Sequence, residues 1–226
     1  MLYKIVFAVV KLFFAKLKVT AEHSIKEPAV FVCNHLGAFG PIAMMLYFPA
    51  LVRPWVNHRS TKKGLAAKEI AKNLFRKDSK VPKWVRKSAG KVLEKPALWV
   101  MKALKAIPVY SDAINVCDTL GESVRALKSG LSIAVFADKG SDHIDESVCE
   151  GIQKGCIYVA HLYGRKSGSP LLFYPVHISR KRREIQVGAP VVYQKSGEAK
   201  KEIRRVGDLL TKAMQELAVK EDKRPA

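Results

Sequence analysis

The sequence lacks several features that would by themselves assign it to a functional class. None of its four cysteines, Cys33, Cys117, Cys149 and Cys156, forms a Cys-x-x-Cys pair, so neither a zinc ribbon nor a redox couple is predicted. No Gly-x-Gly-x-x-Gly follows the first apolar strand, which disfavours a dinucleotide-binding enzyme. We therefore expect reduced cysteines, as in a reducing compartment, and no metal or other cofactor.

Acidic residues are also scarce. The 226 residues include 20 Asp+Glu against 40 Lys+Arg, a net charge of +20, and the excess is concentrated in residues 51–105. Hydrophobic residues make up 48% of the chain, so the charge belongs to a chain that can form a core. Such a charge predicts an acidic partner. Because no nucleic-acid-binding motif accompanies it, a nucleic-acid binder is only a remote alternative and no nucleic acid is expected.

Long apolar runs are missing from residues 1–20. The longest one there, Ile5–Val10, has six residues, whereas a membrane-spanning helix needs about 20. Lys4, Lys11 and Lys18 recur every seven residues and would form one stripe on a helix that is otherwise mostly apolar. We predict that this segment is an amphipathic helix at an anionic membrane surface. A helix docked on the core with a solvated lysine stripe is the alternative.

The rest of the chain alternates apolar strand patterns with helical patterns. This alternation predicts one α/β domain over residues 21–226, with a mostly parallel mixed sheet flanked by helices. Pro54 should restrict its strand to an edge or an end, and Pro82 and Pro96 should break the long helical stretch. The predicted strands are Ala29–Cys33, Leu51–Val56, Ile107–Tyr110, Leu131–Ala137, Leu171–Ser179 and Glu184–Val192, and the predicted helices start at Pro41 and cover residues 60–106, 115–128, 151–163 and 199–219.

Asn34 and His35 follow directly on the first of these strands. A loop of small residues and then a helix come next, so the imidazole lies at the carboxyl end of a strand, where open α/β sheets bind ligands. A histidine titrates near neutral pH and can take a proton from an alcohol. On these residues alone, His35 is either a general base or a structural histidine.

Four segments in succession resemble the motifs of the glycerolipid acyltransferase family, the group that contains the 1-acylglycerol-3-phosphate acyltransferases. In the family they read Asn-His-x4-Asp after an apolar strand, an apolar strand ending in a basic residue, Phe-Pro-Glu-Gly-Thr-Arg, and an apolar strand with a central Pro. The corresponding segments here are VFVCNHLGAFGP around Asn34-His35, AIPVYSD at Ala106–Asp112, FADKGS at Phe136–Ser141 and LLFYPVHI at Leu171–Ile178. Order, spacing and strand context agree over most of the chain.

The resemblance implies the fold of these enzymes and an acyl-transfer reaction. It implies that His35 acts as general base on a hydroxyl of a lysolipid acceptor, which then attacks the thioester of acyl-CoA or of an acidic acyl-carrier protein. In the family the motif Asp orients this histidine, but the fifth residue after His35 is Gly40, so the first motif is a divergent Asn-His-x4-Gly. Loss of an orienting carboxylate costs about 10⁴ in rate in serine proteases.

Three consequences of Gly40 stay open. The first is that another acid, such as Asp138, takes over the orienting role. The second is that the enzyme is slow or specialised for another acceptor. The third is that the chain is a non-catalytic or impaired binder of lipids or acyl chains on the same fold.

The substrate contacts also depart from the family pattern. Asp138 to Ser141 stand where the family carries Glu-Gly-Thr-Arg, the loop that holds the acceptor's phosphate or glycerol. Lys139 restores a cation but not the bidentate fork of Arg. The predicted substrate-binding residues are Asn34, Lys139, Gly140, Ser141, Arg53 and Arg59.

Other histidines are weaker candidates. We expect His58 to be exposed on a basic face and His161 to lie on a helix surface. His143 stands in an acidic loop and is a remote metal candidate, and His177 is predicted to support the site from the fourth motif.

The sequence therefore predicts a peripheral membrane acyltransferase at the cytoplasmic face of a membrane, with anionic lipids, an acyl donor and a lysolipid as partners. In the family, the basic residue of the second motif and the Arg of the third contact the phosphate, whereas this chain has Tyr110 or Ser111 and Ser141 at these places. Its charge therefore suits membrane docking better than recognition of a substrate phosphate.

Overall fold

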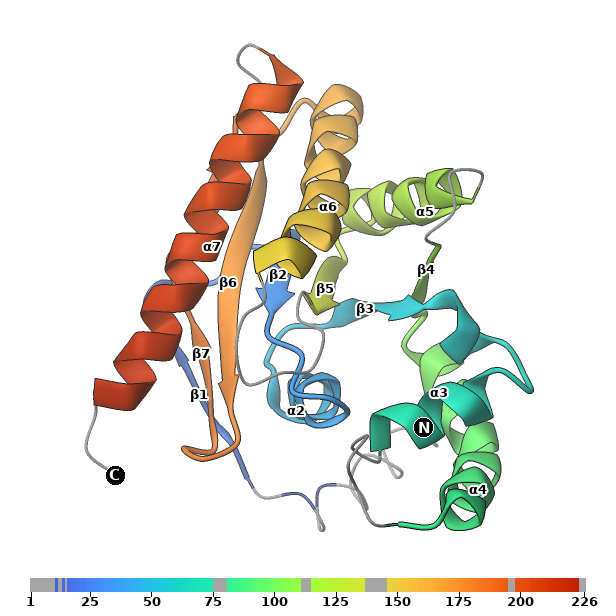
Figure 1. The fold of residues 1–226 in the computed structure, drawn as a ribbon. Coiled ribbons are helices and arrows are strands. Elements are labelled where there is room, and N and C mark those ends of the chain that lie inside the picture. Colours follow the sequence, from blue (N-terminus) through green and yellow to red (C-terminus); the bar gives the residue numbers. More distant parts are fainter. Residues whose placement is uncertain are drawn as a thin grey trace.

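The computed structural model describes residues 11, 14, 16–74, 81–110, 115–136, 146–194 and 198–223, in which helices flank a mixed sheet (Figure 1). The strands are β1 (Lys18–Ala21), β2 (Ala29–Cys33), β3 (Val52–Asn57), β4 (Ile107–Val109), β5 (Ser132–Phe136), β6 (Leu171–Ser179), β7 (Glu184–Val187) and β8 (Val191–Tyr193). The helices are α2 (Phe39–Tyr47), the short 3-10 helix η1 (His58–Thr61), α3 (Ala66–Leu74), α4 (Lys83–Ala103), α5 (Val116–Lys128), α6 (Glu146–Ser167) and α7 (Ala199–Lys223).

The strands follow the order β1-β7-β6-β2-β5-β3-β4, and β8 pairs with the first part of β6. β2 is parallel to both of its neighbours, β5 and β6, and the parallel part continues through β3 and β4. β7 and β8 run antiparallel to β6, and β1 is parallel to β7. The predicted α/β fold with a mostly parallel mixed sheet is therefore confirmed.

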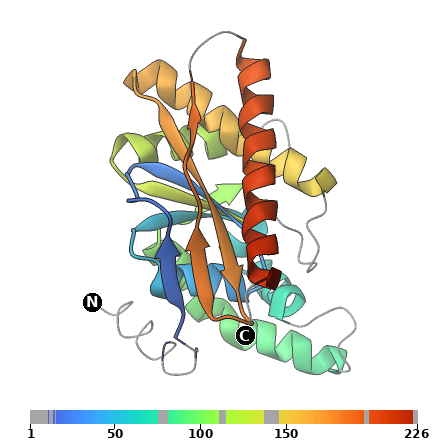
Figure 2. The same cartoon turned by 90° about the vertical axis from the view of Figure 1, so that its left-hand side faces the viewer.

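Helices cover both faces of the sheet because its central strands are apolar on both sides. Every residue of β2 is buried. Val30 and Val32 pack with side chains of α5, α6 and α7, whereas Phe31 and Cys33 pack on the opposite face with side chains of α2. α7 runs along the length of β6 in both views (Figures 1 and 2). β2 thus passes through the centre of the core and carries the residues that follow it to a fixed place.

The end of the predicted first helix is wrong. Lys18–Ala21 form β1, which pairs with β7 in the register Val19 to Ile185, so a helix over residues 1–20 cannot reach Lys18. Val19 and Thr20 are β-branched and half-buried, which suits a strand. Most of the remaining segment lies outside the described residues, and its helix stays a prediction.

Proline explains two further differences. The predicted strand Glu184–Val192 is divided into β7 and β8 by Gly188-Ala189-Pro190, because proline cannot donate a ladder hydrogen bond. β3 lies inside the sheet and not at its edge, but its pairing with β4 begins only at Trp55, so Pro54 has a partner strand on the β5 side alone.

The predicted break of the helical stretch at Pro96 is wrong. Pro96 lies inside α4, which begins directly after Pro82. Pro96 removes the hydrogen bond to the carbonyl of Val92, but both residues are exposed, so that water can solvate this carbonyl. In the part of the chain that the structure describes, no helix combines the length and the apolar character needed to cross a membrane.

Candidate active site

The carboxyl end of β2 places Asn34 and His35 in the middle of the sheet. β5 and β6 lie on either side of β2 and run parallel to it, so three neighbouring strands end here in the same direction. Ligands of open α/β sheets bind outside such strand ends. The fold therefore brings His35 to a place where a substrate can reach it.

The side-chain amide of Asn34 makes two hydrogen bonds to the neighbouring strand β6. Its Nδ2 donates to the carbonyl of Ile178 (3.0 Å), and its Oδ1 accepts from the backbone N–H of Ile178 (2.7 Å). The residue is only 7% exposed, so both bonds satisfy polar groups that water does not reach. Asn34 thus holds the end of β2, and with it the backbone of His35, against β6. A contact of Asn34 with substrate stays a prediction.

His35 is half-buried at the start of a sharply turned loop. Its ring meets the ring of Phe136, the last residue of β5, edge to face, with 5.9 Å between the centroids. The next two residues, Leu36 and Gly37, have left-handed φ angles of 44° and 62°. This conformation costs a residue such as Leu roughly 1–2 kcal/mol, and strained backbone of this kind clusters at functional sites.

Gly40, at the place of the motif Asp, lies in the first turn of α2 against the backbone of His35. A Cβ built on Gly40 would lie 2.3 Å from the carbonyl oxygen of His35 and 3.1 Å from that of Asn34. Real Cβ atoms do not approach an oxygen so closely, so only glycine fits here in this loop conformation. Close packing therefore accounts for Gly40, and an orienting carboxylate at this position would require a different loop.

Cys33 is the thiol nearest to His35 in the sequence. It is completely buried, and its Sγ lies 3.8 Å from the carbonyl oxygen of Phe31. Burial strongly raises the pKa of this thiol, which disfavours the thiolate. Cys33 is thus a core residue, and the candidate chemistry belongs to the imidazole.

Arg180 is a cation beside this loop that the sequence analysis missed. It begins the turn from β6 to β7, and its guanidinium lies over the ring of Phe39, 5.6 Å from the centroid. Phe39 opens α2, so Arg180 lies against the helix that follows the His35 loop. The available signal was the run Arg180–Arg183 directly after the fourth motif, but its place depends on β6 lying next to β2.

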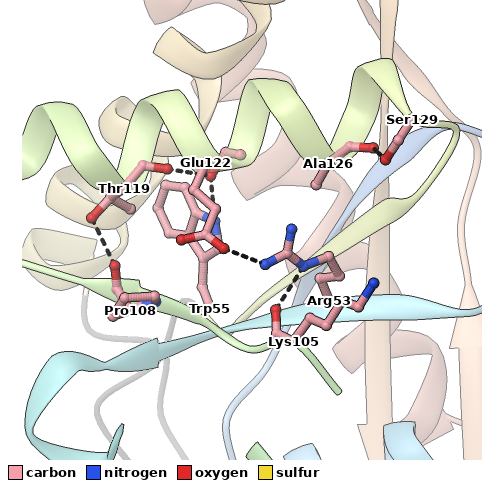
Figure 3. Close-up of polar contacts among 9 residues, drawn as sticks. Arg53, Trp55, Lys105, Pro108, Thr119, Glu122, Ala126 and Ser129 are labelled. Atoms are coloured by element: carbon pink, nitrogen blue, oxygen red, sulfur yellow. Dashed lines mark hydrogen bonds and ion pairs between the residues drawn. The ribbon is translucent and has the colours of Figure 1, made fainter. Parts of the chain in front are cut away.

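Arg53, a predicted substrate contact, makes hydrogen bonds to other residues of the protein. Its Nη2 donates to the Glu122 carboxylate on α5 (2.5 Å) and its Nε to the Lys105 carbonyl (2.6 Å) (Figure 3). Its side chain is 12% exposed, so these bonds join β3, α5 and the end of α4 in a sheltered place. Next to it, Trp55 Nε1 donates to the Ser123 hydroxyl (3.0 Å).

A pocket of about 610 Å³ opens beside Arg53, and its lining includes Lys63, Lys102, Lys105 and Glu122. None of its lining residues comes from β2, the His35 loop or α2, so this pocket is separate from the candidate active site.

The remaining predicted site residues are dispersed or lie outside the described residues. Arg59 pairs with Glu69 through its Nε (3.1 Å) and is half-exposed. Asp138, Lys139, Gly140 and Ser141 lie outside the described residues, so their contacts stay predictions.

The other predicted histidines differ in their surroundings. His58 is half-buried and stacks on Tyr110 at 5.0 Å, so the expectation of an exposed residue is wrong. His161, on α6, lies 3.2 Å from the Tyr193 hydroxyl through its Nδ1. His177 is buried on β6, one residue before Ile178, whereas His143 lies outside the described residues. Among the described residues, no group of three or more His, Cys, Asp or Glu is placed to hold a metal ion.

No family model matches the sequence, and no curated protein matches it. Among solved structures, this chain is similar to the 1-acyl-sn-glycerophosphate (LPA) acyltransferase PlsC from Thermotoga maritima, with 15% sequence identity and a TM-score of 0.49, over 99% of this chain and 78% of that one. A likeness at this level concerns the course of the chain and says nothing about activity.

Proposed function

We propose that this protein is a peripheral membrane acyltransferase that moves a fatty acyl group from acyl-CoA or acyl-carrier protein to a hydroxyl of a lysoglycerolipid. We place it at the cytoplasmic face of a membrane. The observation that carries the proposal is His35 at the carboxyl end of the central strand, on a backbone held by Asn34 and Gly40. The four motif-like segments of the sequence support the same reaction.

In the proposed reaction, a ring nitrogen of His35 takes the proton of the acceptor hydroxyl while the hydroxyl oxygen attacks the thioester carbonyl. The C–S bond then breaks, and the products are the ester and a thiol, which receives the proton. A positioned base of this kind contributes about 10²–10⁴ in rate. Because Gly40 supplies no carboxylate, orientation of the ring is assigned to its contact with Phe136 and to Asp138.

The acceptor's phosphate is assigned to Arg180, together with Lys139, Gly140 and Ser141. Arg180 lies against the helix that follows the His35 loop, with its guanidinium over the ring of Phe39. A guanidinium carries several N–H donors and can bind a phosphate through two of them. Arg53 and Arg59 are weaker assignments, since each already pairs with a carboxylate.

The proposal is tested by release of free thiol from purified full-length protein with acyl-CoA or acyl-carrier protein and lysolipid vesicles. We expect His35→Ala to lower the rate at least about 100-fold, as removal of a general base does. His58→Ala is the matched control, because His58 stands in a second Asn-His pair and stacks on Tyr110 away from β2. It should retain the rate within about twofold.

Full activity of His35→Ala would contradict the role of His35. If the wild-type protein releases no thiol from any donor and yet binds lysolipid or acyl chains, the chain is a non-catalytic lipid binder on this fold.

A further inference from the structure

The outward face of α4 combines exposed apolar and cationic side chains. Trp84 is 72% exposed and Val92 is 74% exposed, both unusual for large apolar residues. Lys87, Lys91 and Lys95 are exposed as well. With about 100° of rotation per residue, residues 84, 87, 91, 92 and 95 fall within an arc of about 140° and therefore share one side of the helix.

Another part of the α4 surface, which carries Gly90 and Glu94, packs against α3. A Cβ built on Gly90 would lie 2.3 Å from the carbonyl oxygen of Ala67, so the two helices cross in close backbone contact. Glu94 turns inward as well: its Oε1 accepts from the backbone N–H groups of Gly64 (2.5 Å) and Ala67 (3.2 Å) at the start of α3. Since Glu94 is the one acidic residue in α4, the outward face of this helix carries positive charge alone.

A second cationic element lies at the same end of the molecule. The turn between β6 and β7 contains Arg180, Lys181, Arg182 and Arg183 in succession. In Figures 1 and 2, this turn and α4 both lie at the lower end, and α2, which follows the His35 loop, also lies in this lower half. A flat partner at this end would therefore meet both cationic elements close to the candidate site.

We propose that the outward face of α4 and the β6–β7 turn dock the protein on the surface of an anionic lipid bilayer. Trp84 and Val92 would enter the boundary between head groups and acyl chains, and the lysines would lie at the phosphates, as in interfacial amphipathic helices. The inference gives a location to the proposed membrane association. It does not depend on the proposed reaction, because docking is measured without thioester or turnover.

The experiment is co-sedimentation of the full chain with vesicles of phosphatidylglycerol and phosphatidylcholine, with pure phosphatidylcholine for comparison. Anionic lipid contributes about 1 kcal/mol per basic residue, or about fivefold in affinity. We therefore expect the variant Lys87→Glu/Lys91→Glu/Lys95→Glu to bind about 100-fold more weakly. Trp84→Ala should lose about tenfold, with binding to pure phosphatidylcholine weak throughout.

The matched control carries the same charge reversals on α7, at Lys200, Arg204 and Lys212, which are exposed on another long basic helix. Its affinity should fall by less than about threefold, and thermal unfolding should show that all the variants are folded. An equal loss in both triple variants would mean that binding depends on net charge alone, and would overturn the proposal. So would unchanged vesicle binding of the α4 variant, or a loss of binding to an acidic acyl-carrier protein without a loss on vesicles.

Discussion

Gly40 lies so close to His35 that a Cβ on Gly40 would be 2.3 Å from the His35 carbonyl oxygen. This contact joins the first turn of α2 to His35, the second residue after β2, and it sets the path of the loop between them. In the sequence, Gly40 stands where the family carries a catalytic carboxylate. In the structure, the absence of a side chain at Gly40 allows the loop to pack against α2.

We expect Gly40→Ala to destabilise the protein by about 2 kcal/mol, because the new methyl group collides with backbone and forces a shift of the loop or the helix. Gly40→Asp should be destabilised as well and should not gain activity, since its carboxylate cannot be placed without rebuilding the loop. Gly121→Ala in α5 is the matched control, because a Cβ built on Gly121 would lie 3.6 Å from Nη1 of Arg125, an ordinary contact with the end of a flexible side chain. Urea unfolding should show it unchanged or up to about 1 kcal/mol more stable, and a stable Gly40→Asp with raised activity would contradict this account.

Replacing Asn34 should damage both stability and the placement of His35. Asn34→Ala leaves the buried N–H and C=O of Ile178 without their side-chain partners, at a cost of about 2–4 kcal/mol. Asn57→Ala offers a comparison, because Asn57 is exposed and accepts one bond from the Arg59 N–H. Its unfolding free energy should fall by about 1 kcal/mol or less. Equal losses of stability in the two variants would show that the bonds between Asn34 and Ile178 contribute no more than the exposed bond between Asn57 and Arg59.

Arg180→Ala should raise the KM for a phosphate-bearing lysolipid about tenfold or more, because a charge-assisted contact is lost. The KM for an acceptor without phosphate should stay within about twofold, as should kcat. Arg165→Ala, an exposed residue in the last turn of α6, is the control and should leave both constants unchanged. Equal changes in KM for both acceptors would show that Arg180 does not recognise the phosphate.

Arg53 should behave as a structural residue. Arg53→Met breaks the ion pair with Glu122 and the bond to the Lys105 carbonyl, and we expect a loss of stability of about 1–3 kcal/mol with little change in KM. A double-mutant cycle with Glu122→Gln measures the coupling of the pair, which should be clearly positive. A large rise in KM without a loss of stability would instead support the substrate contact predicted from the sequence.

Glu202 should make stability depend on pH in the acid range. The carboxyl of Glu202 is buried and accepts hydrogen bonds from the Arg205 side chain and from the backbone N–H of Gln194. The bond from Arg205 first, and that from Gln194 second, lower the pKa of Glu202 below its ordinary value of 4.5. The stabilisation is therefore present above about pH 4.5 and is lost as the pH falls through the folded-state pKa. Glu202→Gln should be less stable than wild type at pH 7 by about 1–2 kcal/mol, and the difference should shrink below pH 4.5.

Glu198→Gln is the comparison for this measurement, since the pair of Glu198 with Lys201 is exposed. Unfolding curves at several pH values should separate the two variants, and a difference for Glu202→Gln that does not change with pH would contradict the assignment.

The sequence alone determined the elements whose signal is local. β2 and β6 were predicted with the right ends, because a strand buried on both faces reads as a continuous apolar run. The same pattern placed His35 at a strand end and led to the mixed, mostly parallel sheet. Local signals were weaker where proline lay in a solvated helix, as at Pro96, and where a short edge strand followed a helical pattern, as at β1.

Only the tertiary structure decided which distant residues support this site. Ile178 is 144 residues from Asn34, and Arg180 reaches Phe39 because β6 pairs with β2. An apolar run encodes that a strand is buried but not which strand lies beside it, so neither contact could be read from the chain. The scarcity of acidic residues was visible from the start. That Glu94 turns inward, so that α4 presents cations and Trp84 on the same face, required the packing of α4 on α3.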